Sequence, residues 1–241
     1  MATAVIVGAS SGIGHALAKE LSSRGYTLGL VARREDLLRQ LASELPGKSI
    51  VDVVDVTNLD QATERLTAMF EKLGQVDLFI YNSGIGRTNP PLDLAPELDT
   101  VQVNVVGFVN AMNVAVKAME RQGSGHLVGV SSIAGFRGAG RIPAYGASKA
   151  FMSNYLEGLH CRMTAISPAF AVTDVLPGFV RTPMTASNKK MFWVATAEKA
   201  ARQIVDAIVA KRRIVYVTRR WRLIAWLMRA LPVPLWKQAQ R

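Results

Sequence analysis

Two side chains in the segment 131–149 have the types and spacing that proton transfer requires. Tyr145 and Lys149 are four residues apart, and Pro143 just before them is a residue type well tolerated at the start of a helix. Positions i and i+4 share one helix face, so we expect the ammonium close to the phenol. A neighbouring cation favours the phenolate, which would lower the tyrosine pKa from near 10 toward the range of a general acid/base.

A hydroxyl precedes this pair. Ser132 lies thirteen residues before Tyr145 and follows a predicted strand over residues 126–130, where its hydroxyl could hydrogen-bond a carbonyl oxygen. The three side chains together predict a site for proton transfer between carbonyl and alcohol. The alternative is that Tyr145 and Lys149 are ordinary neighbours on an amphipathic helix, which is the usual meaning of this spacing.

The N-terminal segment has the pattern of a strand, a glycine turn and a helix. The apolar run Ala4–Val7 is followed by helical periodicity that Gly25 closes. In such turns the glycines let the backbone approach a pyrophosphate, which the helix N-terminus then binds. A plain turn is the alternative, because the glycine spacing differs from the general dinucleotide fingerprint. The candidate cofactor residues here are Gly8, Ser10, Ser11, Gly12, Ile13 and Gly14.

The rest of the chain alternates strands with helices. This alternation predicts an α/β fold, a doubly wound parallel sheet of the Rossmann-like type, as a single domain over residues 1–217. A chain of 241 residues is long enough to bury such a core. The later predicted strands are 28–31, 49–54, 76–81, 126–130, 169–176 and 214–217, and the later predicted helices are 58–73, 94–121, 144–163 and 197–210.

The end of the second predicted strand bears on the choice of cofactor. Ala32 is followed by Arg33 and Arg34, where an NAD-binding fold carries an acidic residue for the ribose hydroxyl. Arginine instead accommodates a 2′-phosphate. The sequence therefore predicts NADP(H), with Arg33 as the favoured contact, although surface arginines at a strand end are common.

The segments SSIAG and YGASK, with the glycine turn, resemble the short-chain dehydrogenase/reductase family. The resemblance covers roughly residues 3–217. It implies that Ser132 polarises the substrate oxygen, that Tyr145 exchanges the proton, and that Lys149 lowers the tyrosine pKa and holds the nicotinamide ribose. It also implies a fourth catalytic member, Asn104, which would bind water in a proton relay. The alternative for Asn104 is a buried amide that bonds helix backbone.

The same resemblance implies further cofactor contacts. Tyr81 and Ser83 depart from the family's usual Asn-Asn-Ala-Gly, and Val7 stands where the family often has Thr. The implied contacts are Asp55 and Val56 at the adenine, Asn82 and Gly84 after the fourth strand, and Pro177, Gly178, Val180 and Thr182 at the nicotinamide.

Substrate and assembly are less constrained by the sequence. The segment 185–194 is expected to form a mobile flap, and the apolar residues in and beside it favour an apolar substrate, with a packing role as the alternative. The resemblance implies a homodimer or homotetramer that pairs through the helices 94–121 and 144–163.

Composition excludes several other classes. The single cysteine, Cys161, cannot form an intramolecular disulfide, and no Cys/His cluster indicates a metal. The N-terminus has no basic stretch before its apolar run, so we expect a first strand, no signal peptide and a cytoplasmic protein. Zinc-finger spacing and RNA-binding aromatic signatures are missing, so no nucleic-acid partner is expected.

The C-terminal extension 218–241 carries much of the charge. Residues 211–241 hold nine Lys/Arg and no acid, out of a net charge of +11. An amphipathic helix followed by a short tail is predicted over 219–236, and the apolar face of the helix carries Trp221, Ile224, Leu227, Met228 and Leu231. It would lie over the substrate entrance and contact an anionic membrane or a lipidic substrate. The alternative is that this face packs on the protein itself. Two prolines stop the segment, so it does not predict a bilayer span.

The leading functional prediction is an NADP(H)-dependent oxidoreductase of carbonyls or secondary alcohols, acting on an apolar or lipid-like small molecule with Tyr145 as general acid/base. The alternative is a non-catalytic NADP-binding or membrane-surface protein on the same fold, since fold does not guarantee activity. The complete set Asn104, Ser132, Tyr145 and Lys149 argues against that alternative.

Overall fold

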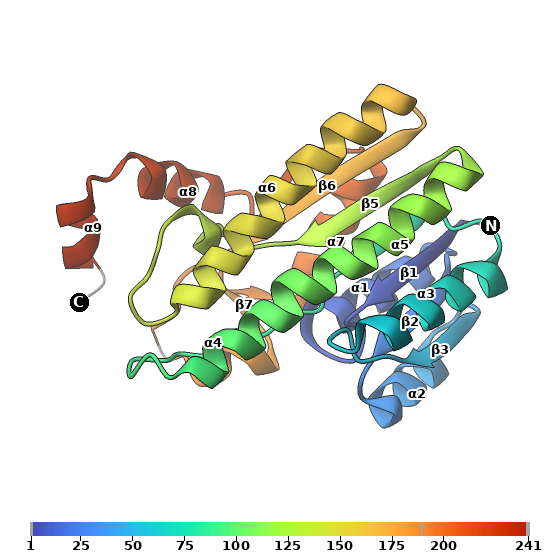
Figure 1. Ribbon diagram of the computed structural model, residues 1–241, viewed down its shortest axis with the longest axis horizontal. Coiled ribbons are helices and arrows are strands. Elements are labelled where there is room, and N and C mark those ends of the chain that lie inside the picture. The colour runs from blue at the N-terminus through green and yellow to red at the C-terminus, as the bar shows by residue number, and fades with distance from the viewer. Residues whose placement is uncertain (1, 189, 240–241) are drawn as a thin grey trace.

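The computed structural model describes residues 2–188 and 190–239. Seven parallel strands form its central sheet in the order β3-β2-β1-β4-β5-β6-β9 (Figure 1). The order reverses between β1 and β4, and in doubly wound sheets ligands bind at the carboxyl ends of the strands beside such a point. The predicted fold class is confirmed. The strands are β1 Thr3–Val7, β2 Thr27–Ala32, β3 Ser49–Val53, β4 Leu78–Tyr81, β5 Gly125–Val130, β6 Phe170–Pro177 and β9 Ile214–Val217.

Helices cover both faces of the sheet. Alternate residues of β1 point to opposite faces, and on each face they are buried by a different set of helices. Val5 and Val7 belong to one hydrophobic cluster with side chains of α3, α5 and α6, whereas Ala4 and Ile6 belong to another with α1, α2 and α7. A strand buried on both faces reads as a continuous apolar run, as this one does. These helices are α1 Gly12–Ser23, α2 Glu35–Glu44, α3 Leu59–Leu73, α5 Gly107–Gln122, α6 Pro143–Ile166 and α7 Ala197–Val209.

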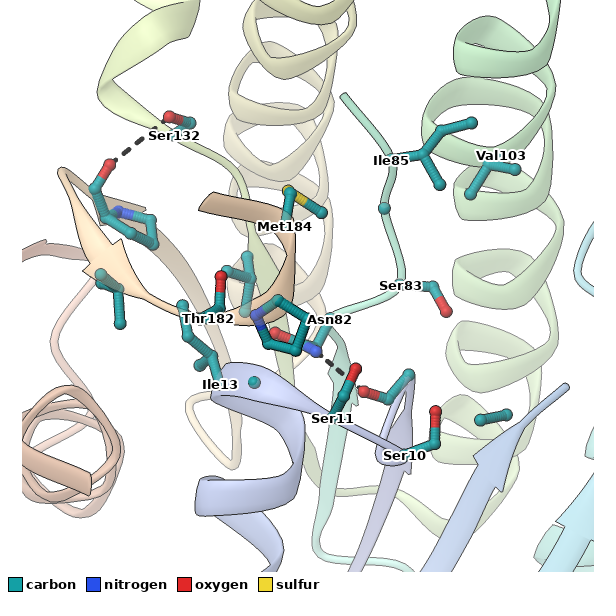
Figure 2. Close-up of a pocket in the computed structure, with 18 of the residues that line it drawn as sticks. Ser10, Ser11, Ile13, Asn82, Ser83, Ile85, Val103, Ser132, Thr182 and Met184 are labelled. Carbon is teal, nitrogen blue, oxygen red and sulfur yellow. Dashed lines mark hydrogen bonds between the residues drawn. The ribbon is translucent and has the colours of Figure 1, made fainter. Parts of the chain in front are cut away.

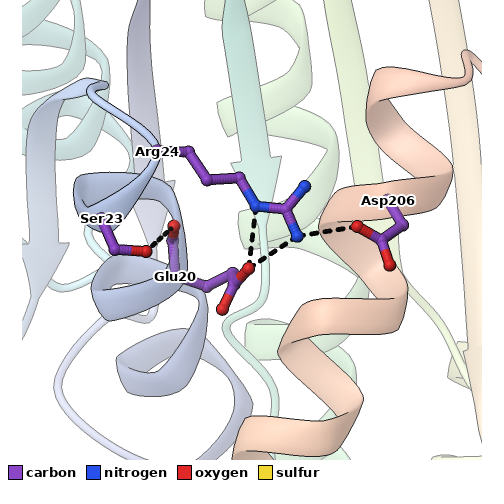
Figure 3. Close-up of polar contacts among 4 residues, drawn as sticks. All are labelled: Glu20, Ser23, Arg24 and Asp206. Atoms are coloured by element: carbon purple, nitrogen blue, oxygen red, sulfur yellow. Dashed lines mark hydrogen bonds and ion pairs between the residues drawn. The ribbon is translucent and has the colours of Figure 1, made fainter.

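Helices α1 and α7 are also joined by a polar contact. Arg24, just after α1, donates from Nε to Glu20 Oε1 at 2.8 Å and from Nη2 to Asp206 Oδ1 of α7 at 2.7 Å (Figure 3). Solvent-exposed ion pairs contribute only about 0–1 kcal/mol. Apolar packing therefore does most to hold α1, and with it the glycine turn, on the sheet.

Two helical features differ from the sequence-based expectation. The predicted helix 94–121 is divided into α4 Leu94–Val101, a π-helical segment Gln102–Val106 and α5. Such π segments are frequent at functional sites, and this one carries Asn104. Helix α2 was not predicted, although its acidic first turn and buried Leu38 and Leu41 are ordinary helix signals.

The C-terminal extension forms two short helices, α8 Trp221–Ala230 and α9 Val233–Ala239, which project beyond the sheet (Figure 1). The predicted helix ends before Pro232, as the prolines indicated, because the chain turns at Leu231, and the predicted short tail forms the helix α9. The predicted apolar face is partly wrong, since Trp221 and Met228 are buried but Leu227 is exposed. Residues 240–241 of the extension lie outside the described residues. None of the described helices meets the length and hydropathy needed to cross a bilayer.

Candidate active site

A cavity of about 400 Å³ opens at the carboxyl ends of the central strands, beside the point where the strand order reverses. Every candidate site residue from the sequence lines it except Gly14 and Asn104. Figure 2 shows lining residues from the glycine turn, from the segment after β4 and from the Thr182 segment facing one another. Further lining residues, which were not among the candidate site residues from the sequence, are Ala32, Val54, Ser83, Ile85, Val103, Val130, Ser131, Pro183, Met184 and Thr185.

The glycine turn forms one end of this cavity. Gly8 follows β1 with φ of 91°, and a Cβ there would overlap the backbone of Ser83. Asn82 Nδ2 donates to the Gly8 carbonyl at 2.9 Å, which ties the end of β4 to the turn (Figure 2). Ser11, the residue before α1, makes no side-chain cap. The N–H groups of the first turn of α1 are thus left for an anion.

Two arginines lie at the same end of the cavity. Arg34 Nη2 donates to Ser10 Oγ at 2.9 Å and to Ser11 Oγ at 2.7 Å. Arg33 is exposed, and its Nη1 lies 3.9 Å from Asp55 Oδ2. The sequence favoured Arg33 as the contact, but it is Arg34 whose guanidinium folds back onto the glycine turn. The guanidinium of Arg34 is held in this position by its bond to Ser11, twenty-three residues earlier in the chain. The spacing of residues at a strand end does not reveal such a distant partner.

The three proposed catalytic side chains converge at the other end. Helix α6 begins at Pro143, as predicted, and places Lys149 Nζ 5.9 Å from the Tyr145 ring centroid. Lys149 Nζ donates to the Val130 carbonyl at 2.9 Å, so the lysine is anchored to β5. The Ser132 hydroxyl lies beside the Tyr145 phenol and donates to the Pro177 carbonyl at 3.4 Å (Figure 2). A phenol, a hydroxyl and an ammonium therefore share one wall of the cavity.

The electrostatics of this wall correct one expectation. Burial raises the pKa of Tyr145 above its usual value, and the Ser132 hydroxyl beside it only partly opposes this. The lowered pKa expected from Lys149 is wrong in this structure, because desolvation penalises the phenolate and the ammonium is directed to the Val130 carbonyl. Burial also lowers the pKa of Lys149, to about 8, while the charge of Asp174 raises it.

Asn104 lies next to the cavity wall but does not line the cavity. Its side chain is fully buried in the π-helical segment. Oδ1 accepts from Ile85 N at 2.8 Å, and Nδ2 donates to Ile85 O at 2.8 Å and to Ser148 Oγ at 3.0 Å. Three of its four hydrogen-bonding positions are therefore used by protein groups. The amide holds the segment after β4 against α6, and the backbone that it bonds, at Ile85, belongs to that non-helical segment and not to a helix as the alternative expected.

Helix α8 packs against the segment 177–182, which lines the expected nicotinamide end of the cavity. The sequence indicates residues 177–182 for this wall and no support from the C-terminal extension. Trp221 is 1% exposed, and its indole lies so close to Gly178 that a Cβ there would overlap the ring. The same ring packs against Phe179, Phe192 and Trp193, with centroids 5.5, 5.0 and 5.9 Å away. The place of Trp221 on the apolar face of the predicted helix indicated that the ring would be buried. It did not indicate that the ring would pack against Gly178.

The extension also contacts the loop between Ser132 and Tyr145. Trp236 Nε1 donates to the Gly138 carbonyl at 2.7 Å, and Arg137 Nη1 donates to the Leu231 carbonyl at 2.6 Å. These bonds attach α8 and α9 to the loop that connects two of the proposed catalytic residues. Within residues 2–188 and 190–239, no group of three or more His, Cys, Asp or Glu could hold a metal ion.

Comparison with known proteins gives the following matches. A family model described as short chain dehydrogenase matches residues 2–192. An uncharacterized oxidoreductase of Myxococcus xanthus (strain DK1622) is 35% identical, with 99% of this chain and 96% of that protein covered. A short chain dehydrogenase/reductase from Burkholderia phymatum in complex with NAD superposes with a TM-score of 0.84 at 22% identity, covering 94% and 92% of the two chains. The structure of ElxO with NADP bound has a TM-score of 0.79 at 20% identity, covering 90% and 96%.

Proposed function

Because the chain belongs to the short-chain dehydrogenase family, we propose that it is an NADP(H)-dependent oxidoreductase that interconverts carbonyls and secondary alcohols. The observation that carries this proposal is the convergence of Ser132, Tyr145 and Lys149 on one wall of a cavity that has the glycine turn at its other end. A nicotinamide dinucleotide bound there would supply or accept the hydride.

The residues of the cavity fit such a cofactor. The uncapped first turn of α1 suits a pyrophosphate, and Pro177, Gly178 and Val180 line the same cavity. Val56 and Asp55 would lie at the adenine, Asn82 would lie beside the glycine turn that it bonds, and Gly84 and Thr182 would lie at the nicotinamide end. One known relative in fold holds NAD and another holds NADP, so fold alone does not select between the two.

The charges beside β2 support NADP(H) over NAD(H). Two guanidinium groups, from Arg33 and Arg34, line the cavity where β2 ends at Ala32. The Oδ1 atom of the carboxylate of Asp55 accepts hydrogen bonds from Thr57 N at 3.0 Å and Thr57 Oγ1 at 2.8 Å, and its Oδ2 lies 3.9 Å from Arg33 Nη1, so one carboxylate faces two guanidinium groups here. A 2′-phosphate would meet cations here, and charge-assisted bonds to phosphate are strong.

The proposed proton chemistry uses the chain's own groups. Burial keeps Tyr145 protonated near neutral pH, as a general acid for carbonyl reduction requires. The phenol would donate its proton to the substrate oxygen, and Ser132 Oγ would donate a hydrogen bond to the same oxygen. Lys149 would hold the ribose and supply positive charge beside the phenol. In alcohol oxidation the phenolate would accept the proton instead.

Several features support an apolar substrate. Ile85, Val103 and Met184 line the cavity, and the loop between β7 Val180–Arg181 and β8 Ala195–Thr196 carries Phe192 over the Trp221 ring. Ligand sites commonly combine such apolar walls with a few polar groups at the reacting atoms. This is the loop proposed as the flap, and Lys189 within it lies outside the described residues.

The proposal is tested by measuring cofactor binding and then substrate reduction. Binding of NADPH and NADH is measured by fluorescence titration, and a panel of ketones, sterols and acyl thioesters is then screened for loss of NADPH absorbance. We expect NADPH to bind more tightly and at least one apolar carbonyl to be reduced. Failure of both cofactors to bind at millimolar concentration would reject the proposal.

A second candidate role, contact with an anionic membrane surface, follows from the outer side of the extension. Leu223, Trp226 and Val233 are 68%, 71% and 71% exposed, and no acidic residue lies in 211–241. Apolar side chains among arginines are typical of interfacial helices. We propose that α8 keeps its inner face on the protein and presents this outer face to lipid.

We also propose a homodimer or homotetramer. Helices α4, α5 and α6 form the side of the molecule through which the family pairs its subunits. Phe151 on α6 and Leu98 and Val101 on α4 are exposed there, at 40%, 56% and 38%. Burial of such side chains against a second copy would be favourable.

A further inference from the structure

Two buried charged side chains lie at the proposed catalytic wall: Lys149 is part of it, and Asp174 does not line the cofactor cavity. Among the residues the structure describes, the buried Asp, Glu, Lys and Arg side chains are Asp52, Lys149 and Asp174. Asp52 has an ion-pair partner, with its Oδ1 2.9 Å from Arg65 Nε. Within the same described ranges, neither Lys149 nor Asp174 has an ion pair within 4.0 Å. Burying a charge costs several kcal/mol unless other groups compensate it, so these two need an explanation.

Both side chains attach to the same short stretch of β5. Lys149 reaches it from α6 and donates to the carbonyl of Val130 at 2.9 Å. Asp174 reaches it from β6, where it is paired in register with Gly129, and its Oδ1 accepts from Ser131 Oγ. The opposite charges are thus bonded to consecutive residues at one strand end, Val130 and Ser131. Ser132, the proposed substrate contact, is the next residue along the chain.

We propose that Asp174 is a positioning residue of the active site: it is the buried counter-charge of Lys149, and through Ser131 it fixes the strand end that carries Ser132. This inference rests on the proposed function for its catalytic meaning. The pairing of Asp174 with Lys149 does not depend on that function.

The electrostatics agree with this geometry. Burial lowers the pKa of Lys149, and the negative charge of Asp174 raises it again. Burial raises the pKa of Asp174, and the bond from Ser131 and the charge of Lys149 lower it. Each group therefore favours the charged form of the other. With a pKa of about 8, Lys149 stays charged at neutral pH only by a narrow margin, so the carboxylate matters.

A second cavity, also of about 400 Å³, is lined by Asp174 and shares no lining residue with the cofactor cavity. It gives the carboxylate a route for proton exchange that does not pass through the cofactor cavity. The charged groups that face Asp174 are Lys149 from α6, Arg213 from the turn before β9, Glu157 from α6 and Arg229 from α8. Arg213 is partly neutralised by Glu157, whose Oε1 lies 3.2 Å from its Nη1.

The pairing is tested by titrating Lys149 directly. The ¹³Cε resonance of Lys149 is followed against pH by NMR in the cofactor-free protein and is assigned by its loss in Lys149→Met. Asp174→Asn keeps the side-chain shape and an oxygen that accepts from Ser131, but it removes the charge. We expect a midpoint near pH 8 in the wild type and a midpoint at lower pH in Asp174→Asn. Asp52→Asn, which also removes a buried carboxylate, should leave the Lys149 midpoint unchanged.

A reciprocal measurement keeps the test decisive if Asp174→Asn does not fold. The ¹³Cγ resonance of Asp174 should titrate at higher pH in Lys149→Met than in the wild type, because the favourable charge is lost. Asp174→Glu should restore the Lys149 midpoint toward the wild-type value. An unchanged Lys149 midpoint in folded Asp174→Asn, or an unchanged Asp174 midpoint in Lys149→Met, would overturn the proposal.

Activity provides a separate readout. If Asp174 positions the site, kcat for carbonyl reduction in Asp174→Asn falls relative to the wild type by a factor that grows as pH rises from about 7 to about 9, since Lys149 of the variant loses its charge at a lower pH than Lys149 of the wild type. A merely structural role would lower kcat equally at all pH values, and that result would overturn the assignment. Absence of turnover in the wild type would reject the proposed function while the NMR result still decides the pairing.

Discussion

The indole of Trp221 lies against the backbone of Gly178, so a residue near the C-terminus supports the wall of the proposed cofactor cavity. The ring also contacts Phe192 of the loop between β7 and β8. Because α8 is attached at the same time to Arg137 before α6, it joins two segments that flank the proposed catalytic residues. The extension is thus packed against the site rather than free of it.

The contact predicts a large effect of Trp221→Ala on stability. Removal of a buried aromatic ring costs about 3–5 kcal/mol. The free energy of unfolding, measured with urea, should fall by this amount, and KM for cofactor should rise because Gly178 loses its support. Trp226→Ala is the matched control, since this indole on the same helix is 71% exposed and should change stability by less than about 0.5 kcal/mol. Equal losses in the two variants would contradict the packing described for α8.

Cofactor preference should depend on Arg34. Its guanidinium lies on Ser10 and Ser11 at the glycine turn, and a charge-assisted bond to a phosphate contributes about 1.5–3 kcal/mol. Arg34→Ala should weaken NADPH binding by about tenfold or more and leave NADH binding nearly unchanged. Arg39→Ala, which removes an exposed arginine of α2 paired with Glu35, should change neither affinity. Equal affinity of the wild type for NADPH and NADH would argue against the assignment.

The pH dependence of carbonyl reduction follows from two buried groups. Burial raises the pKa of Tyr145, so the phenol stays protonated through neutral and mildly alkaline pH. Lys149, with a pKa of about 8, loses its charge first as pH rises. The kcat/KM for reduction should therefore be level below about pH 8 and decline above it. A profile that stays level to pH 10, near the ordinary tyrosine pKa, would show that the lysine charge is not needed.

Membrane contact can be tested without disturbing the fold. Deleting residues 219–241 would remove the buried Trp221, so point changes on the outer face are cleaner. Binding to vesicles with anionic lipid should occur at low salt, weaken as salt is added and be lost in Leu223→Ser/Trp226→Ser. Leu94→Ser, at an exposed apolar position on α4, serves as the control. Wild-type protein that ignores anionic vesicles at low salt would exclude this surface as a lipid contact.

Local spacing predicted much of the fold and of the candidate site. The glycine turn after β1 and the i, i+4 pair of Tyr145 and Lys149 depend on residues close in sequence, and periodicity reveals both. The direction of the Tyr145 pKa depends on burial by distant segments, so helix spacing alone gave the wrong sign. Asp174 was passed over for a similar reason, because its partners lie on a neighbouring strand and on α6. The hydrogen bonds of Arg34 to Ser10 and Ser11 depend on how the chain enters α2, and residue spacing at the strand end does not show this.

The central claim is that Tyr145 transfers the proton, and the most direct measurement is kcat of Tyr145→Phe for carbonyl reduction under saturating NADPH. General acid/base groups contribute about 10² to 10⁴ in rate, so we expect a loss of that size with NADPH affinity nearly unchanged. Tyr155→Phe on the same helix, whose ring packs on Phe108, is the control and should retain activity. A Tyr145→Phe protein that keeps more than about half of the wild-type kcat would contradict the claim, because the Tyr145 phenol would then not be the general acid.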